Sequence, residues 1–137
     1  MVAGRRGLAV RLLSPGTCCG VDVPFAAAAD GVSMGRIDAF DAAADNVVDL
    51  SADCRLPTAA AYDEWCDGHE APAHLERAAY ALPELNRENL PGAELIASGG
   101  CNATATILGL KPLVDTGVLG PDDGDVVVDV KVGSSEG

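Results

Sequence analysis

Residues 95–117 read LIASGGCNATATILGLKPLVDTG, which predicts a strand, a glycine turn and a helix in direct succession. The apolar run at 95–97 favours a short strand, and Ser98-Gly99-Gly100 favours a tight turn. Over 102–116 the apolar residues recur at helical spacing, with Pro112 expected to kink the helix and Gly117 to end it. The predicted apolar stripe consists of Ala103, Ile107, Leu110 and Val114.

Cys101 stands in the first turn of this predicted helix. In parallel α/β sheets ligands bind beyond the carboxyl ends of strands, which is where this residue falls. The N–H groups and the positive dipole end of a helix N-terminus favour thiolate over thiol and can hold a phosphate or an oxyanion. Gly99 and Gly100 let a substrate approach the backbone closely. The alternative is a small apolar residue at a packed turn, and the spacing alone leaves both open.

The residues upstream predict a second unit of the same kind. Val21–Ala27 favours a short buried strand, and a helix over 30–44 is expected with Asp30 or Ser33 as its cap. The β-branched run at 46–51 favours another strand. A strand, a helix and a strand at this spacing form a βαβ unit, which indicates a parallel sheet.

Three further segments complete the prediction. Pro57 and Thr58 begin a helix that reaches about Cys66. The polar, proline-interrupted stretch at 67–91 predicts a long connection with one short helix near Ala73–Ala79. Val126–Val132 predicts a strand with alternate valines on one face and charged residues on the other.

Composition narrows the possible functions. Hydrophobic residues make up 48% of the 137 residues and aromatic residues 4%, so a core of Ala, Val and Leu is expected. Nine basic and twenty-one acidic residues give a net charge of −12, which disfavours nucleic acid and membrane-surface partners. No apolar run approaches the roughly 18–20 residues that span a bilayer. Such acidity suits a high-salt cytoplasm, although an ordinary acidic protein is the alternative.

The cysteines and histidines do not form a familiar metal or disulfide pattern. The cysteine count is odd and no signal-like segment precedes them, so we expect thiols in a reducing cytoplasm. Without a CxxC pair we assign no metal site. His69 and His74 are five residues apart rather than four, and we expect both on the solvent side of loops. The five cysteines are Cys18, Cys19, Cys54, Cys66 and Cys101.

Four segments together resemble one enzyme family. Ser98–Thr106 resembles the active-site segment of the N-acetyl-γ-glutamyl-phosphate reductases, closest to the archaeal branch that acts on glutamyl or aminoadipyl phosphates held on an amino-group carrier protein. Asp49–Leu56 resembles the family's DLSADFRL, and Tyr80–Leu85 its YGLPEL. Asp129–Ser135 resembles the strand and loop after the cysteine helix. Order and spacing agree, and the resemblance covers about residues 20–137.

The resemblance implies an NADPH-dependent reduction of an acyl phosphate to a semialdehyde in arginine or lysine biosynthesis. The Cys101 thiolate would attack the acyl carbon, phosphate would leave, and hydride from the cofactor NADP(H) would reduce the thioester. Ser51, Arg55 and Asn102 are assigned to substrate binding. Arg55 suits a bidentate pair with phosphate or carboxylate, and an ion pair with a nearby Asp is the equal alternative. Asp53 is expected to be structural.

The chain also departs from the family. It has no GxSGxxG-like loop for the cofactor pyrophosphate, so no cofactor-binding residues are assigned, and the family's general acid/base histidine has no counterpart. Gly99 replaces a proline, Cys54 an aromatic residue and Asp30 a histidine. We interpret these features as those of a truncated copy.

The expected architecture is α/β: part of a parallel-sheet, Rossmann-like nucleotide-binding domain followed by the start of a catalytic α+β domain. Residues 1–19 are placed outside the family match, 20–97 in the C-terminal part of the NADP-binding domain, and 98–137 in the catalytic and dimerisation domain. The expected partners are a small acyl phosphate or a carrier protein that bears it, with homo-oligomers in the intact cytoplasmic enzyme.

Two other functions compete with the reductase. The first is a non-catalytic fragment, either inert or paired with an intact paralogue, because the cofactor loop and the histidine are missing. The second is a cysteine hydrolase that uses Cys101 with His69 or His74, although neither histidine lies in a convincing motif.

Overall fold

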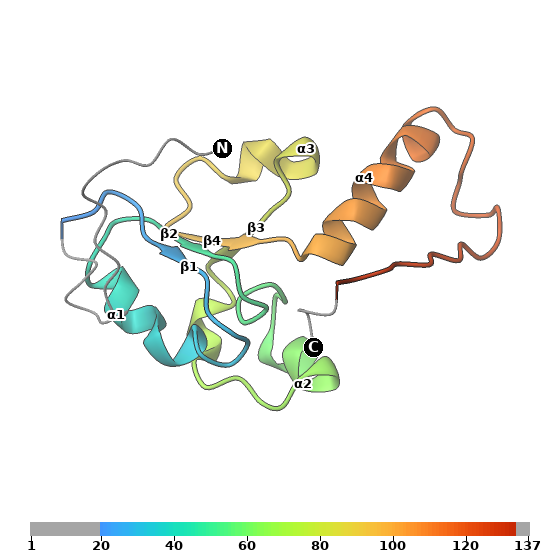
Figure 1. Ribbon diagram of the computed structural model, residues 1–137. Helices are drawn as coiled ribbons and strands as arrows, with labels where there is room; N and C mark the ends of the chain where they lie inside the picture. Colours follow the sequence, from blue (N-terminus) through green and yellow to red (C-terminus); the bar gives the residue numbers. More distant parts are fainter. Residues whose placement is uncertain (1–19, 134–137) are drawn as a thin grey trace.

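The computed structural model describes residues 20–133 and contains one parallel sheet (Figure 1). Its strands are β1 (Phe25–Ala26), β2 (Val47–Asp49), β3 (Ala78–Ala81) and β4 (Leu95–Ser98), in the spatial order β1-β2-β4-β3. Every neighbouring pair is parallel, as the predicted βαβ unit requires. The α/β class is therefore confirmed.

The core lies between the sheet and α1 (Ile37–Asp41). Ile37 and Phe40 of this helix are buried against Val47 of β2 and Leu95 of β4. In Figure 1, α1 and α2 (Ala59–Trp65) lie on one side of the sheet and α3 (Pro83–Asn86) on the other. A smaller cluster of Met34, Tyr62 and Leu75 connects α2 to the neighbouring loops.

The predicted βαβ elements are present but shorter than expected. β1 has two residues rather than seven. Pro24 has no N–H to donate to the sheet, and its carbonyl accepts the Val48 N–H at 3.0 Å, so the strand begins only after it. The predicted helix at 30–44 is a 3₁₀ turn, η2 (Met34–Arg36), followed by α1, which ends at Asp41. Ser33 precedes η2 without any side-chain cap, so its expected capping role is wrong.

The segment at 67–91 contains a strand that the sequence did not predict. We expected one short helix near Ala73–Ala79, but that region divides into η3 (Pro72–His74) and the start of β3. β3 pairs with β4 from Ala78↔Leu95 to Ala81↔Ser98. Alanine favours helices, yet the backbone hydrogen bonds to β4 override that preference at the sheet edge. The 3₁₀ turn η4 (Arg87–Asn89) follows α3.

The last helix, α4 (Cys101–Asp115), begins within one residue of the prediction and contains Pro112. It points away from the sheet in Figure 1, and none of its residues is buried. The expected apolar stripe therefore does not pack on the core, because the chain leaves the sheet at Gly99-Gly100. Gly117 ends the helix with φ +70°, as predicted.

The predicted strand at Val126–Val132 does not form within the described residues. This segment is extended and follows the turn at 121–123, but it pairs with no other strand of residues 20–133. A strand needs a partner for its backbone groups, and alternation along the sequence does not supply one. The predicted strand is therefore wrong for this part of the structure.

Candidate active site at the carboxyl edge of the sheet

Cys101 is the first residue of α4 and directly follows the turn that leaves β4. Its side chain is exposed, and its Sγ lies 3.8 Å from Oδ1 of Asn102, which is also exposed. The Thr104 N–H donates to the Gly100 carbonyl at 2.8 Å and closes the first helical turn. The thiol therefore stands where the first-turn N–H groups of a helix open toward solvent.

Two hydroxyl oxygens occupy the space that a side chain at Gly99 would need. A Cβ added at Gly99 would lie 2.9 Å from Thr104 Oγ1 and 2.9 Å from the Tyr80 hydroxyl oxygen. Tyr80 belongs to β3 and Thr104 to α4, so side chains from the edge strand and from the cysteine helix both approach Gly99. The Gly99 N–H donates to the Ala81 carbonyl at 3.3 Å, which fixes the turn on the same strand. Only glycine fits here without a shift of its neighbours.

Arg55 connects the ends of two strands beside the cysteine. Its Nε donates to the Ser98 carbonyl at 2.9 Å and its Nη2 to the Leu50 carbonyl at 2.7 Å. Its Nη1 would lie 3.0 Å from a Cβ on Gly100, the residue before Cys101. The guanidinium therefore lies at the N-terminus of α4, and both acceptors that the structure shows are carbonyls rather than the Asp of the alternative prediction.

Ser51 has a role inside the loop after β2. Its hydroxyl donates to Asp49 Oδ2 at 2.9 Å and accepts the Asp53 N–H at 3.1 Å, and the residue is buried. Asp53 is fully buried and accepts the N–H groups of Gly31 and Met34 at 2.7 and 2.9 Å. Asp53 is therefore structural, as expected, while the Ser51 hydroxyl is committed to the loop in this conformation.

Burial changes the acidity of two groups next to this network. Burial, together with Asp49 and Asp53, raises the pKa of the Cys54 thiol to about 12. Burial, with smaller effects of Asp53 and Cys66, raises the pKa of Tyr62 to about 12. Both groups are therefore neutral at physiological pH. The Cys54 thiol is buried, whereas Cys101 is exposed to solvent.

The two histidines do not lie on the solvent side of loops as predicted. His69 Nε2 lies 2.9 Å from the Asp53 carbonyl, and its Nδ1 accepts the Ala71 N–H at 3.1 Å. Its ring also meets Tyr62 edge-on, with centroids 4.8 Å apart. Its ring nitrogens are therefore both used in holding loops together, which leaves the hydrolase hypothesis without His69 as a base.

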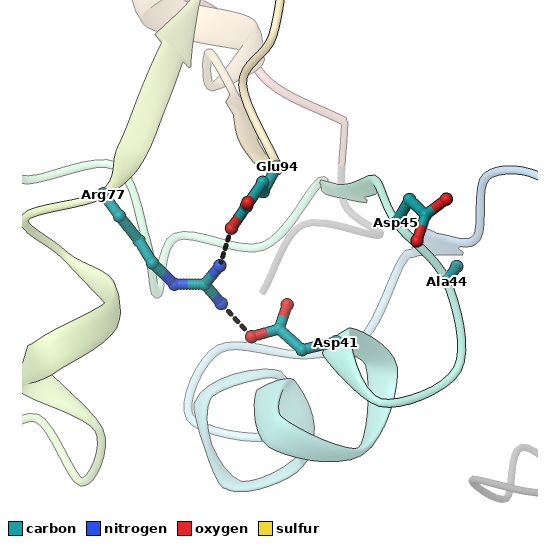
Figure 2. A pocket seen from close by; sticks show the side chains of 5 residues that line it. All are labelled: Asp41, Ala44, Asp45, Arg77 and Glu94. Carbon is teal, nitrogen blue, oxygen red and sulfur yellow. Dashed lines mark hydrogen bonds and ion pairs between the residues drawn. The ribbon is translucent and has the colours of Figure 1, made fainter.

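His74 belongs to a charged cluster at the opposite, amino edge of the sheet. Its side chain is 13% exposed, with Nε2 2.7 Å from Asp38 Oδ1. Arg77 pairs with Asp41 and, at 3.3 Å, with Glu94 (Figure 2). Because Arg77 and Glu94 directly precede β3 and β4, this cluster is separated by the length of the sheet from Cys101. It surrounds a polar cavity of ≈ 420 Å³ lined by Asp41, Ala44, Asp45, Arg77 and Glu94.

The described residues do not form a cradle for a dinucleotide pyrophosphate. The loops after β1 and β2 have N–H groups that already donate to carboxylates, at Gly31 to Asp53 and at Ala52 to Asp30. Donors at this edge include the guanidinium of Arg55 and the first-turn N–H groups of α4. They suit a small anion, and no step through a nicotinamide cofactor follows from residues 20–133.

Sequence reasoning named Cys101 and Arg55 as candidate site residues but did not single out Tyr80 or Thr104, which the structure places beside Gly99. Tyr80 and Thr104 lie within the segments that resemble the family, but their approach to Gly99 depends on the pairing of β3 with β4, which the sequence does not show. The glycine pair was the one local signal, since two adjacent glycines before a helix indicate a crowded turn.

Comparisons with known proteins identify the family of the chain. A family model described as "Semialdehyde dehydrogenase, NAD binding domain" matches residues 1–93, a range that includes the residues 1–19 placed outside the resemblance above. Those nineteen residues lie outside the described structure. No helix within residues 20–133 is long and apolar enough to cross a bilayer.

Curated relatives carry reductase names. A protein of Natronomonas pharaonis, named provisionally as a LysW-L-2-aminoadipate/LysW-L-glutamate phosphate reductase, is 63% identical over 132 residues, which are 96% of this chain and 38% of that protein. The reductase with that name from Saccharolobus solfataricus is 48% identical over 85% of this chain and 33% of its own length. The N-acetyl-gamma-glutamyl-phosphate reductase of Halorhodospira halophila is 47% identical over 83% of this chain and 33% of its own length.

The chain thus spans 38% or less of the length of these relatives. The resemblance to the N-acetyl-γ-glutamyl-phosphate reductases is confirmed, and the acidic composition agrees with relatives from halophilic archaea. The family model matches residues 1–93 of this chain, and the chain has a parallel sheet. The chain therefore belongs to the semialdehyde dehydrogenase NAD-binding domain family.

Proposed function

We propose that this chain carries the nucleophile and an anion-binding residue of an acyl-phosphate reductase of arginine or lysine biosynthesis. The observation that supports it most directly is the position of Cys101, exposed as the first residue of α4, with Arg55 against the preceding Gly100. The relatives named as phosphate reductases support the acyl phosphate as the substrate class. LysW in two of those names supports a carrier-bound substrate.

The proposed step is an acyl transfer to sulfur. The Cys101 thiolate donates its electron pair to the acyl carbon, a C–S bond forms, and the C–O bond to phosphorus breaks with its electrons on the departing phosphate. The guanidinium of Arg55 and the first-turn N–H groups of α4 would stabilise the anion that leaves. Asn102 is proposed to contact the acyl group, while the Ser51 hydroxyl would have to leave Asp49 to take part.

The cofactor and the domain division are part of the same proposal. NADP(H) is proposed as the nicotinamide cofactor of the intact reductase, where it would supply hydride. We also propose that residues 20–97 belong to its nucleotide-binding domain and that 98–137 begin its catalytic domain. Within residues 20–133, the proposed side chains serve the acyl transfer, so this is the step that can be tested on the chain.

Acetyl phosphate provides a simple test. We expect intact-mass analysis of the purified chain to show one acetyl group, removable by hydroxylamine at neutral pH as a thioester is. The Cys101→Ser variant should lose the adduct, whereas Cys66→Ser should keep it because Cys66 is also exposed but lies outside the site. Arg55→Gln should slow the acylation more than Arg55→Lys. An adduct that survives in Cys101→Ser would contradict the proposal.

One observation favours a second candidate, a non-catalytic chain. α4 has no buried residue, so the thiol is not enclosed from water as a thioester intermediate requires. In that case Cys101 and Cys66 would be acetylated equally slowly, and Arg55→Gln would change neither rate.

A further inference from the structure

The loop after β2 carries Arg55, and side chains rather than a regular backbone ladder hold it in place. Residues 51–58 form only bends and turns. The Asp53 carboxylate accepts the N–H groups of Gly31 and Met34 at 2.7 and 2.9 Å, which fixes the middle of the loop. Arg55 follows two residues later, so the orientation of the peptide unit after Asp53 decides where the guanidinium starts.

His69 contacts the main chain of this loop at that peptide unit. Its Nε2 lies 2.9 Å from the Asp53 carbonyl oxygen, and its Nδ1 lies 3.1 Å from the backbone nitrogen of Ala71. A carbonyl oxygen can only accept a hydrogen bond, and a backbone N–H can only donate one. Nε2 therefore carries the proton and Nδ1 carries none, because the neutral Nε2–H tautomer is the form that makes both bonds at once.

The ring of His69 is itself held in place by its neighbours. It meets the buried ring of Tyr62 edge-on, with centroids 4.8 Å apart. The N–H of the next residue, Glu70, donates to the Met34 sulfur at 3.2 Å, and Met34 in turn donates its own N–H to Asp53. The N–H at Nε2 therefore has a fixed direction, toward the Asp53 carbonyl.

We propose that His69 is a positioning residue for Arg55. By donating to the Asp53 carbonyl, His69 orients the peptide unit from which the Arg55 side chain extends to the Ser98 carbonyl, at 2.9 Å, and to Gly100. The inference rests on the proposed function, in which Arg55 stabilises the departing anion. A shift of about 1 Å in such a group can slow a reaction about a hundredfold, so the placement of this guanidinium matters.

Two amide substitutions separate the two hydrogen bonds of His69. The amide nitrogen of glutamine reaches about as far as Nε2, so His69→Gln can keep the bond to the Asp53 carbonyl. The amide oxygen of asparagine takes the place of Nδ1 and accepts the N–H two residues later, as in an Asx turn. His69→Asn therefore keeps the local turn and loses the bond to Asp53.

Acetylation of Cys101 by acetyl phosphate, followed by intact mass, is the first measurement. We expect His69→Asn to slow it about tenfold and His69→Gln to restore most of the rate. In an Arg55→Gln background His69→Asn should have no further effect, because its action passes through Arg55. His74→Asn is the matched control: His74 is also partly buried but lies at the opposite edge of the sheet, so the rate should not change.

Hydrogen exchange of the Arg55 Nε–H is a second measurement, which does not depend on the reaction. This N–H donates to the Ser98 carbonyl, so its exchange with solvent, followed by NMR, reports how firmly the guanidinium is held. We expect exchange about tenfold faster in His69→Asn than in His69→Gln or wild type. The Val47 N–H, which donates to the Glu94 carbonyl at 2.7 Å, should exchange equally in all three proteins.

The results separate this inference from the proposed function. A wild-type chain without an adduct on Cys101 would contradict the proposed function, whereas faster Arg55 exchange in His69→Asn would still support the role of His69. Unchanged Arg55 exchange in His69→Asn would overturn the inference. Equally accelerated exchange of Arg55 and Val47 would overturn it too, because His69 would then stabilise the whole fold. Additive effects of His69→Asn and Arg55→Gln on acetylation would also count against it.

Discussion

Gly99 has the most crowded backbone position at the candidate site. An added Cβ would meet the hydroxyl oxygens of Tyr80 and Thr104 at 2.9 Å each, closer than van der Waals contact allows. We expect Gly99→Ala to lower the free energy of unfolding by about 1–3 kcal/mol, the usual cost of overpacking. Urea denaturation followed by circular dichroism measures this.

Gly109→Ala, in the helix α4 that follows the turn, provides the matched control. A Cβ at Gly109 would meet no atom within 4 Å, so this change should stabilise by about 0.5–1 kcal/mol through helix propensity. Adding Tyr80→Phe and Thr104→Ala to Gly99→Ala should restore most of the loss. A Gly99→Ala protein as stable as wild type would show that the hydroxyls move aside freely.

Cys54 and Tyr62 make stability sensitive to alkaline pH. Burial raises their folded pKa values to about 12, from ordinary values of 9.0 and 10.0. An acid with a raised folded pKa contributes fully below its unfolded pKa, and the contribution is lost as pH rises toward the folded value. The free energy of unfolding should therefore fall as the pH increases from about 9 to 12.

Urea titrations at stepped pH values separate the two groups. Cys54→Ala should be less stable than wild type at neutral pH, because a small cavity replaces the sulfur, but its stability should decline less steeply above the ordinary thiol pKa. Identical pH slopes for wild type and Cys54→Ala would rule out a buried, protonated thiol at this position.

At the level of elements, the two hydroxyl residues that precede helices differ in their contributions. Thr58 Oγ1 accepts the Ala61 N–H at 3.1 Å and caps α2, so Thr58→Ala should cost about 1 kcal/mol. Ser33 Oγ is buried and has no hydrogen-bond partner in the described part of the chain. Ser33→Ala should therefore be neutral or slightly stabilising, because it removes a desolvated hydroxyl. Equal losses in thermal denaturation would contradict this difference.

The elements that were predicted correctly have local signals. Thr58 followed by an alanine-rich run indicated α2, and Gly99-Gly100 with the apolar periodicity indicated α4. β3 was missed because its alanines carry no strand signal, and only β4 provides the backbone partners. The apolar stripe of α4 was predicted from its spacing, but none of its residues is buried, because periodicity does not reveal whether a surface is present to cover it.

For the whole molecule, the net charge of −12 predicts a strong dependence on salt. Repulsion among acidic side chains opposes the compact state and is screened as ionic strength increases. We expect the melting temperature to rise between about 0.1 M and about 2 M KCl, by about 4–8 °C for each 1 kcal/mol of relieved repulsion. Choline chloride should act similarly if screening is the cause. A melting curve insensitive to both salts would contradict a halophilic adaptation.

The site combines residues that the sequence keeps far apart. Arg55 and the Ser98 carbonyl are 43 residues apart, and they meet because β2 and β4 are neighbours in the sheet. His74 and Asp38 are 36 residues apart and meet at the opposite edge. The expected solvent exposure of His69 and His74 was wrong because polar residues in long connections can form hydrogen bonds with distant groups, which no local pattern reports.

By itself, the sequence determined the parallel α/β class, the start of α4 to within one residue and the acidic character of the chain, because these depend on local periodicity, glycine geometry and composition. The tertiary structure alone decided which carbonyls hold Arg55, which hydroxyls close over Gly99 and that α4 leaves the sheet unburied. The physical reason is that hydrogen bonds between strands and contacts between side chains join residues tens of positions apart, and their free energy depends on a spatial order that no short stretch of sequence encodes.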